Sequence, residues 1–130
     1  MRVFLLIMLI NVSIVVDSAA IAAEPSATVS RVTTSFDVRY TEAVLERVSR
    51  LVSEGFKAGQ VHSLMVEVDA MKAETPQAWK YQVVYKGRAR ELQIRALVDE
   101  LGMIDLDFAT DPELAAQIRT VVDAYLSRRN

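Results

Sequence analysis

Apolar side chains recur at every second position in two stretches of the chain, residues 62–71 and 79–85. A connection that contains Pro76 separates the two stretches. A period of two is typical of a β-strand with one buried and one exposed face. We therefore expect two neighbouring antiparallel strands, whose apolar face other elements must cover. The residues that define this face are Leu64, Val66, Val68 and Ala70 in the first stretch and Trp79, Tyr81, Val83 and Tyr85 in the second.

Two other segments have the three- and four-residue spacing of amphipathic helices. The first is expected to begin at Thr41 as its N-cap and to end at Gly59, which suits a left-handed terminal residue. The second follows Asp111 as its N-cap and has Pro112 at its first position. Their apolar stripes consist of Val44, Leu45, Val48, Leu51, Val52 and Phe56 in the first and Leu114, Ile118, Val121, Val122, Tyr125 and Leu126 in the second.

Residues 88–101 give conflicting signals. Their composition favours a helix, whereas Leu92, Ile94, Ala96 and Val98 alternate as in a strand. Lys86-Gly87 before the segment and Gly102 after it are typical of hairpin turns. We interpret the segment as a strand, and we expect another strand over residues 103–109. A short first strand is expected much earlier in the chain, near residues 32–40.

The sequence thus predicts an α+β fold with an antiparallel four- to five-stranded sheet packed against two amphipathic helices. It forms a single domain over residues 32–130. The alternative, if residues 88–101 are helical, is a ferredoxin-like βαββαβ order with an additional C-terminal helix.

The first 23 residues resemble a secretory signal peptide. Arg2 precedes an apolar run over residues 3–16, and small residues follow, with Ala20-Ile21-Ala22 as a cleavage motif. The alternative is an uncleaved membrane anchor, which Asp17 disfavours. We expect cleavage, a flexible tether over residues 24–31, and a periplasmic or secreted protein that meets the membrane only through the signal segment before its cleavage.

Composition restricts the chemistry. The chain has no cysteine, which excludes disulfides, thiol nucleophiles and thiolate metal sites, and its net charge of −2 gives no reason to expect binding to nucleic acid. His62 is the single histidine. The paired carboxylates Glu67 and Asp69, and Asp105 and Asp107, fit the solvated face of a strand better than a calcium site. We therefore predict no enzyme activity, no catalytic residues, no metal and no cofactor.

Several stretches resemble PepSY domains. They are Glu54-Gly-Phe-Lys-Ala-Gly59, Val61-His-Ser-Leu-Met-Val-Glu-Val68, Trp79-Lys-Tyr-Gln-Val-Val-Tyr-Lys-Gly87, Glu91-Leu-Gln-Ile-Arg-Ala96 and Gly102-Met-Ile104. The family's Val-Asp-Ala-x-Thr-Gly ending is replaced here by a longer segment that lacks its Asp and Thr. The resemblance implies a small non-catalytic envelope or secreted module that accompanies, regulates or senses a peptidase.

One face of the expected sheet mixes apolar and polar side chains. If it is open, it is a candidate site for a protein partner in the envelope; if the N-terminal segment or a helix covers it, it is not. A second candidate is the basic cluster of Lys86, Arg88 and Arg90, whose ligand would be an acidic partner or anionic lipid; the alternative is an ordinary charged hairpin tip. The alternatives to a binding module are a small-ligand carrier or enzyme with a pocket between sheet and helices, and a structural component that forms homo-oligomers. The candidate partner-binding residues are Met65, Glu67, Val84, Arg95, Leu97 and Met103.

Overall fold

Four antiparallel strands form one sheet in the order β1-β4-β3-β2. The computed structural model describes residues 29–71 and 75–129. The strands are β1 (Ser30–Phe36), β2 (Gln77–Tyr85), β3 (Arg88–Val98) and β4 (Ile104–Thr110). The sequence predicted this antiparallel α+β fold, and the meander β2-β3-β4 is confirmed.

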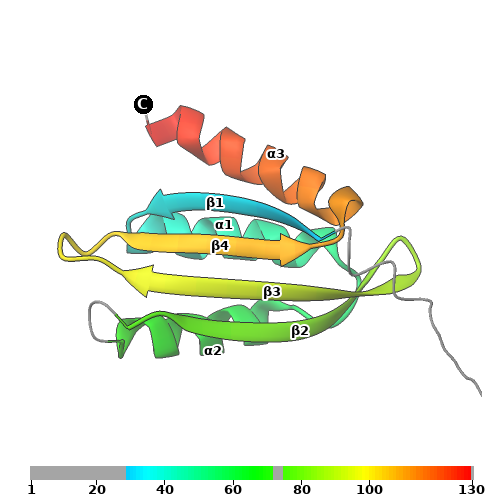
Figure 1. Ribbon diagram of the computed structural model, residues 1–130, viewed down its shortest axis with the longest axis horizontal. Coiled ribbons are helices and arrows are strands. Elements are labelled where there is room, and N and C mark those ends of the chain that lie inside the picture. The colour runs from blue at the N-terminus through cyan, green and yellow to red at the C-terminus, as the bar shows by residue number, and fades with distance from the viewer. Residues whose placement is uncertain (1–28, 72–74, 130) are drawn as a thin grey trace, which may run out of the picture.

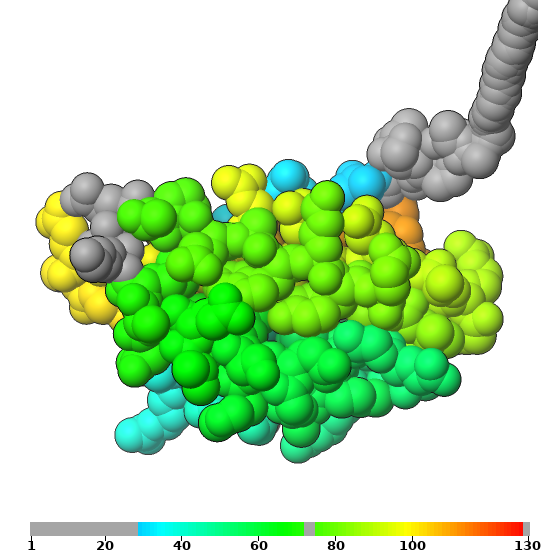
Figure 2. Space-filling view, turned by 90° about the horizontal axis from the view of Figure 1, so that it is seen from below, coloured from blue at the N-terminus to red at the C-terminus, as the bar shows by residue number. Residues whose placement is uncertain are grey.

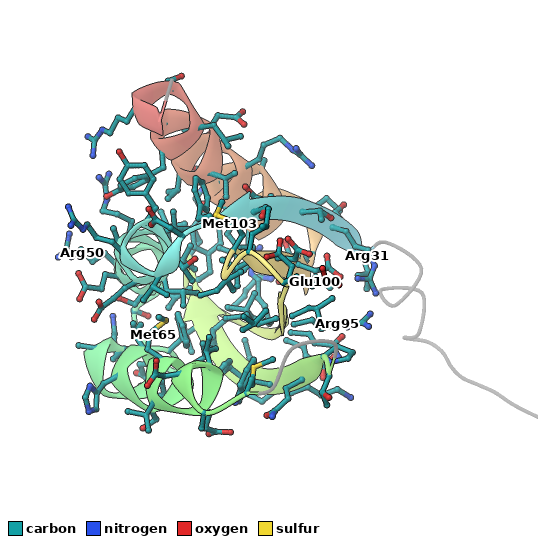
Figure 3. All side chains as sticks on the ribbon, turned by 90° about the vertical axis from the view of Figure 1, so that its left-hand side faces the viewer. Arg31, Arg50, Met65, Arg95, Glu100 and Met103 are labelled. Atoms are coloured by element: carbon teal, nitrogen blue, oxygen red, sulfur yellow. The ribbon has the colours of Figure 1, made fainter. Side chains whose placement is uncertain are left out.

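Three helices accompany the sheet: α1 (Val38–Leu51), α2 (Ala58–Asp69) and α3 (Pro112–Arg129). Helices α1 and α2 lie behind the sheet in the view of Figure 1, and α3 runs along its β1 side. Seen end-on, the helices lie on one side, and the opposite face of the sheet has no helix over it (Figure 3). The sequence predicted two of these helices, and α2 is the additional one.

Side chains of alternate strand residues meet the helices to form the core. Phe36, Leu92 and Phe108 reach this layer from three strands and are fully buried. Leu45, Leu64 and Ile118 reach it from the three helices and are equally buried. Burial at this scale is the main stabilising contribution in a chain without disulfides.

Residues 88–98 are a strand, so the helical alternative and the ferredoxin-like order are wrong. Lys86 and Gly87 have φ angles of 52° and 75°, which is the geometry of a two-residue type I′ hairpin turn. Leu92, Ile94 and Ala96 are all buried against the helices. Burial with a period of two therefore outweighs the helical propensity of the segment, which is at most about 0.7 kcal/mol per residue.

The strand expected over residues 62–71 is instead the second half of α2. Its buried residues are Val61, Leu64 and Val68, which have helical spacing, while Val66 is 55% exposed. Leu64 and Val68 fit both a period of two and helical spacing. The strand interpretation chose the period of two, which is wrong here. Helix α2 covers the part of the sheet that β2 and β3 form (Figure 1).

The boundaries of α1 also differ from expectation. Asp37, not Thr41, is the N-cap, and its carboxylate accepts a hydrogen bond of 2.8 Å from the Tyr40 N–H. Thr41 lies inside the helix, fully buried. Helix α1 ends at Leu51, and Gly59 lies in the first turn of α2 instead of ending α1.

The connection between α1 and α2 crosses the end of β2. Ser53 N–H donates to the Val84 carbonyl (2.9 Å), and Val84 N–H donates to the Glu54 carbonyl (3.0 Å). Gly55 has a φ of +96°, and a Cβ atom there would lie 2.0 Å from the Gln82 carbonyl oxygen. The close backbone approach therefore requires glycine.

The expected signal peptide, residues 1–23, lies outside the described residues. Ser30 and Arg31, the end of the expected tether, belong to β1. Within residues 29–71 and 75–129, no helix is both long and apolar enough to cross a membrane.

Candidate functional site

The six candidate partner residues do not lie on one face. Met65 and Glu67 are on α2, on the helix side of the sheet, and Met103 follows the turn between β3 and β4. We call the face of the sheet with no helix over it the open face. Only Val84, Arg95 and Leu97 occupy strand positions whose side chains point to it. Figure 3 shows Met65 between α1 and α2, on the opposite side of the sheet from Arg95.

The open face is mainly polar. Strand registers place Thr33, Asp107 and Arg95 side by side across β1, β4 and β3. Arg31 forms an ion pair with Asp107 on this face. Of the apolar residues expected there, Leu97 and Val84 lie on this face; both are half-buried, and they stand near opposite ends of the sheet. The expected apolar patch is therefore absent from the described part of this face.

An apolar groove lies at the end of the molecule where β3 turns into β4. It has a volume of about 500 Å³ and runs between α1, α2 and the ends of these two strands. Val38 on α1 and Val66 on α2 are 51% and 55% exposed. The lining residues are Val38, Glu42, His62, Met65, Val66, Val68, Asp69, Met71, Val98, Gly102 and Ile104.

The apolar wall of the groove follows from how α2 packs. Because Val61, Leu64 and Val68 turn toward the core, their neighbours Met65 and Val66 face outward beside this stripe. Met65 is half-buried and packs against the core. Methionine side chains are flexible and polarizable, so a wall that contains Met65 and Met71 can adapt to different apolar ligands.

The β3–β4 turn forms the far end of the groove. The Asp99 carboxylate accepts hydrogen bonds from the N–H groups of Leu101 (2.8 Å) and Met103 (3.0 Å). Gly102 completes the turn with a φ of +82°. The turn is therefore held in one conformation, and it presents Leu101 with 88% of its surface exposed.

Polar groups occur at the rim of the groove. Glu42, His62 and Asp69 are all exposed, and two of the three are carboxylates. Throughout the described ranges, no group of three or more His, Asp or Glu residues is placed to hold a metal ion. What the groove offers chemically is apolar contact beside a mainly acidic rim.

The basic cluster predicted at the hairpin is partly neutralised by the start of α3. Arg90 is buried, and its Nη1 lies 2.9 Å from Asp111 Oδ1 and 3.0 Å from Glu113 Oε1. Lys86 Nζ lies 3.0 Å from Glu113 Oε2. Hydrogen bonds from Lys86 and Arg90 hold the pKa of Glu113 below its ordinary value. Of the three basic residues, Arg88 has no ion pair among the described residues.

The sequence contained a signal for this network. Arg90 has the same strand parity as the buried Leu92 and Ile94, so its side chain had to enter the core side. Asp111 and Glu113 stand at the start of a helix that directly follows β4. Strand parity therefore predicts the buried cation, and the start of the next helix predicts the acids that pair with it.

Comparison with protein-family models, with curated proteins and with solved structures gives no match to this chain. The resemblance to PepSY domains thus stays a hypothesis from the sequence. One of the stretches that carry it, Val61 to Val68, is helical.

Proposed function

We propose that the protein is a small, exported, non-enzymatic binding module of a bacterial envelope, and that its groove binds an apolar segment of a protein partner. The observation that carries the proposal is an apolar wall beside an acidic rim, formed by the exposed Val38 and Val66 and the half-buried Met65. Contiguous exposed apolar surface of this kind commonly marks an interaction site. Export is supported by the signal-like sequence of the first 23 residues.

Charge indicates the chemistry of the partner. Glu42 and Asp69 lie at the rim, so a basic residue next to the apolar anchor of the partner meets opposite charge there. The partner segment therefore combines large apolar side chains with lysine or arginine. A peptidase is the class of partner that the resemblance to PepSY domains implies.

An internal ligand is a weaker explanation of the architecture. Fully buried side chains, among them Phe56, Leu92 and Phe108, fill the layer between sheet and helices. The groove is at the surface, where a protein segment reaches it directly.

The test is a titration of the isotope-labelled protein with short amphipathic peptides, one rich in leucine and lysine and one rich in leucine and glutamate, followed by NMR. We expect the leucine–lysine peptide to shift the amide signals of Val38, Met65 and Val66 and to bind more tightly than its acidic counterpart. Shifts confined to the open face of the sheet, or equal affinity for both peptides, would contradict the proposal.

A matched pair of variants sharpens this test. Val66→Lys introduces a positive charge into the groove, and Val29→Lys introduces the same charge at a valine of equal exposure, 55%, outside it. Lysine is a good helix former, so Val66→Lys preserves α2. We expect Val66→Lys to weaken binding of the leucine–lysine peptide at least tenfold, about 1.4 kcal/mol, and Val29→Lys to leave it unchanged.

A further inference from the structure

The two edges of the sheet differ in how they are protected. At the β1 edge, α3 runs alongside, and the Arg119 guanidinium Nη2 donates a hydrogen bond of 3.1 Å to the Arg31 carbonyl. Helix cover and side-chain bonds of this kind are how proteins protect a strand edge from further pairing. The β2 edge is at the opposite side of the sheet.

At one end, the β2 edge already binds an extended backbone. The N–H and C=O of Val84 point away from β3 and bond to Glu54 and Ser53. In an antiparallel pair the bonding direction alternates from residue to residue. The backbone groups of Gln82, Lys80 and Ala78 therefore point away from β3 as well.

The rest of the β2 edge is accessible at Ala78 and Lys80. Both residues are exposed, and no hydrogen bond from the described residues reaches their outward backbone groups. The Gln82 carbonyl is instead covered by Gly55, where a Cβ atom would lie 2.0 Å from the carbonyl oxygen. Figure 2 looks onto this side of the molecule, where β2 lies at the surface beside α2. The outward-pointing donor and acceptor pairs of Ala78 and Lys80 are what an added strand bonds to.

The side chains along the edge specify the added strand. On the open face, Lys80 is exposed, and Arg95 lies opposite Ala78 in the strand register. On the helix side, Trp79 and Tyr81 are half-buried, and Trp79 Nε1 donates to Glu67. Beside an added strand, the open face therefore offers one cation, Lys80, and the helix side offers two aromatic residues, while Arg95 lies one strand further away. The acidic Glu91 of β3 lies opposite Gln82. An acidic residue of the added strand is therefore better placed beside Lys80 than beside Gln82.

A second copy of the chain suits this edge less well. Antiparallel pairing of two β2 strands about a two-fold axis through residue 80 places Lys80 directly opposite its equivalent. Like charges in directly opposite positions destabilise a strand pair. Self-pairing in this register is therefore disfavoured.

We propose that the β2 edge binds an extended segment of a protein partner by strand addition, and that this segment alternates acidic and apolar residues. The site is separate from the groove and does not depend on it. Acidic residues of the segment lie beside Lys80, and apolar residues pack beside Trp79 and Tyr81. The main-chain bonds supply affinity, and the alternation supplies selectivity.

The probe is a capped eight-residue peptide of alternating glutamate and valine, with alternating lysine and valine as its counterpart. Trp79 is the single tryptophan of the chain, so its fluorescence reports binding at the edge. Amide hydrogen exchange provides the second readout. We expect the acidic peptide to change the Trp79 emission and to slow exchange at Ala78 and Lys80, while the amides of β3 stay as they are.

Two charge reversals serve as variant and control. Lys80→Glu is expected to weaken binding of the acidic peptide at least tenfold, while Arg88→Glu, an equal charge change at the exposed hairpin end, leaves affinity within twofold. Ala78→Pro removes one outward N–H while leaving the bonds to β3 in place, and it is expected to weaken both peptides. Melting curves establish that each variant is folded.

Several outcomes would overturn the proposal. One is binding without slower exchange at Ala78 and Lys80, and another is equal loss of affinity in Lys80→Glu and Arg88→Glu. Slow exchange at these amides in the full chain without peptide would show that the edge is occupied by the chain itself. Slowing that depends on protein concentration would show a second copy there. Because Val66→Lys leaves the edge intact, failure of the groove and failure of the edge are distinguishable.

Discussion

Arg90 shows how one buried charge connects two elements. Its guanidinium bonds to Asp111 and Glu113 at the start of α3, and it stacks 4.8 Å from the centre of the Tyr85 ring. A buried cation is costly unless it is paired. The network thus fixes where α3 leaves the sheet, and it places a carboxylate, Glu113, between two cations.

This geometry predicts a pH dependence of stability. Because the pKa of Glu113 is lower in the folded than in the unfolded chain, its contribution is complete above the unfolded value of about 4.3 and is lost as the pH falls through the folded value. Glu113→Gln should therefore lower the thermal midpoint at neutral pH and converge with the wild type in acid. Thermal unfolding across the acidic range measures this.

Glu100→Gln is the control for that measurement. Glu100 is exposed on the β3–β4 turn and has no ion pair among the described residues. Its replacement should leave the pH profile parallel to that of the wild type. A constant difference between Glu113→Gln and the wild type down to the lowest pH would show that the charge of Glu113 is not responsible.

At the scale of elements, the error over α2 shows the limit of periodicity. Residues 61–68 carry a strand pattern in Leu64, Val66 and Val68 and a helix pattern in Val61, Leu64 and Val68. The pattern alone does not separate the two. The surrounding structure decides between helix and strand for these residues. The apolar face of β2 and β3 must be covered, which a helix does, and the α1–α2 connection already occupies one end of the β2 edge, where a further strand would pair.

Alanine substitutions at Gly55 and Gly59 test the structure of the connection between α1 and α2. Gly55→Ala places a methyl group 2.0 Å from the Gln82 carbonyl oxygen at a φ of +96°, so the backbone must move at a cost of at least about 1–2 kcal/mol. Gly59→Ala meets no atom within 4 Å in the first turn of α2 and should stabilise by up to about 1 kcal/mol. Urea unfolding of both variants measures the difference. Equal stability of the two would contradict the close approach of the connection to β2.

At the scale of the whole molecule, local patterns predicted more than long-range pairing did. The hairpin at Lys86-Gly87, the strands β2 to β4 and the cap of α3 at Asp111 all follow from short stretches of sequence. The pairing of β1 with β4 joins Ser30 to Thr110, and no local signal encodes it. The groove was equally hidden, because it depends on the position of α2.

The last helix has the clearest role in holding these parts together. Leu114 and Ile118 are fully buried, and Tyr125 meets Tyr40 of α1 edge-on with 6.0 Å between ring centres. Through these contacts α3 holds α1 and the β1 side of the sheet in place. A helix built in this way is part of the core and not a detachable arm.

Ile118→Ala tests this role. Truncating a fully buried isoleucine costs about 2–5 kcal/mol, a large part of the roughly 5–15 kcal/mol that stabilises a domain. Gln117→Ala is the matched control, because Gln117 is exposed on the same turn, whereas Arg119 bonds to Arg31 and is not neutral. We expect urea unfolding of the isolated protein to show a sharply lower midpoint for Ile118→Ala and an unchanged one for Gln117→Ala. An unchanged midpoint for Ile118→Ala, combined with weaker partner binding, would instead make α3 a docking arm.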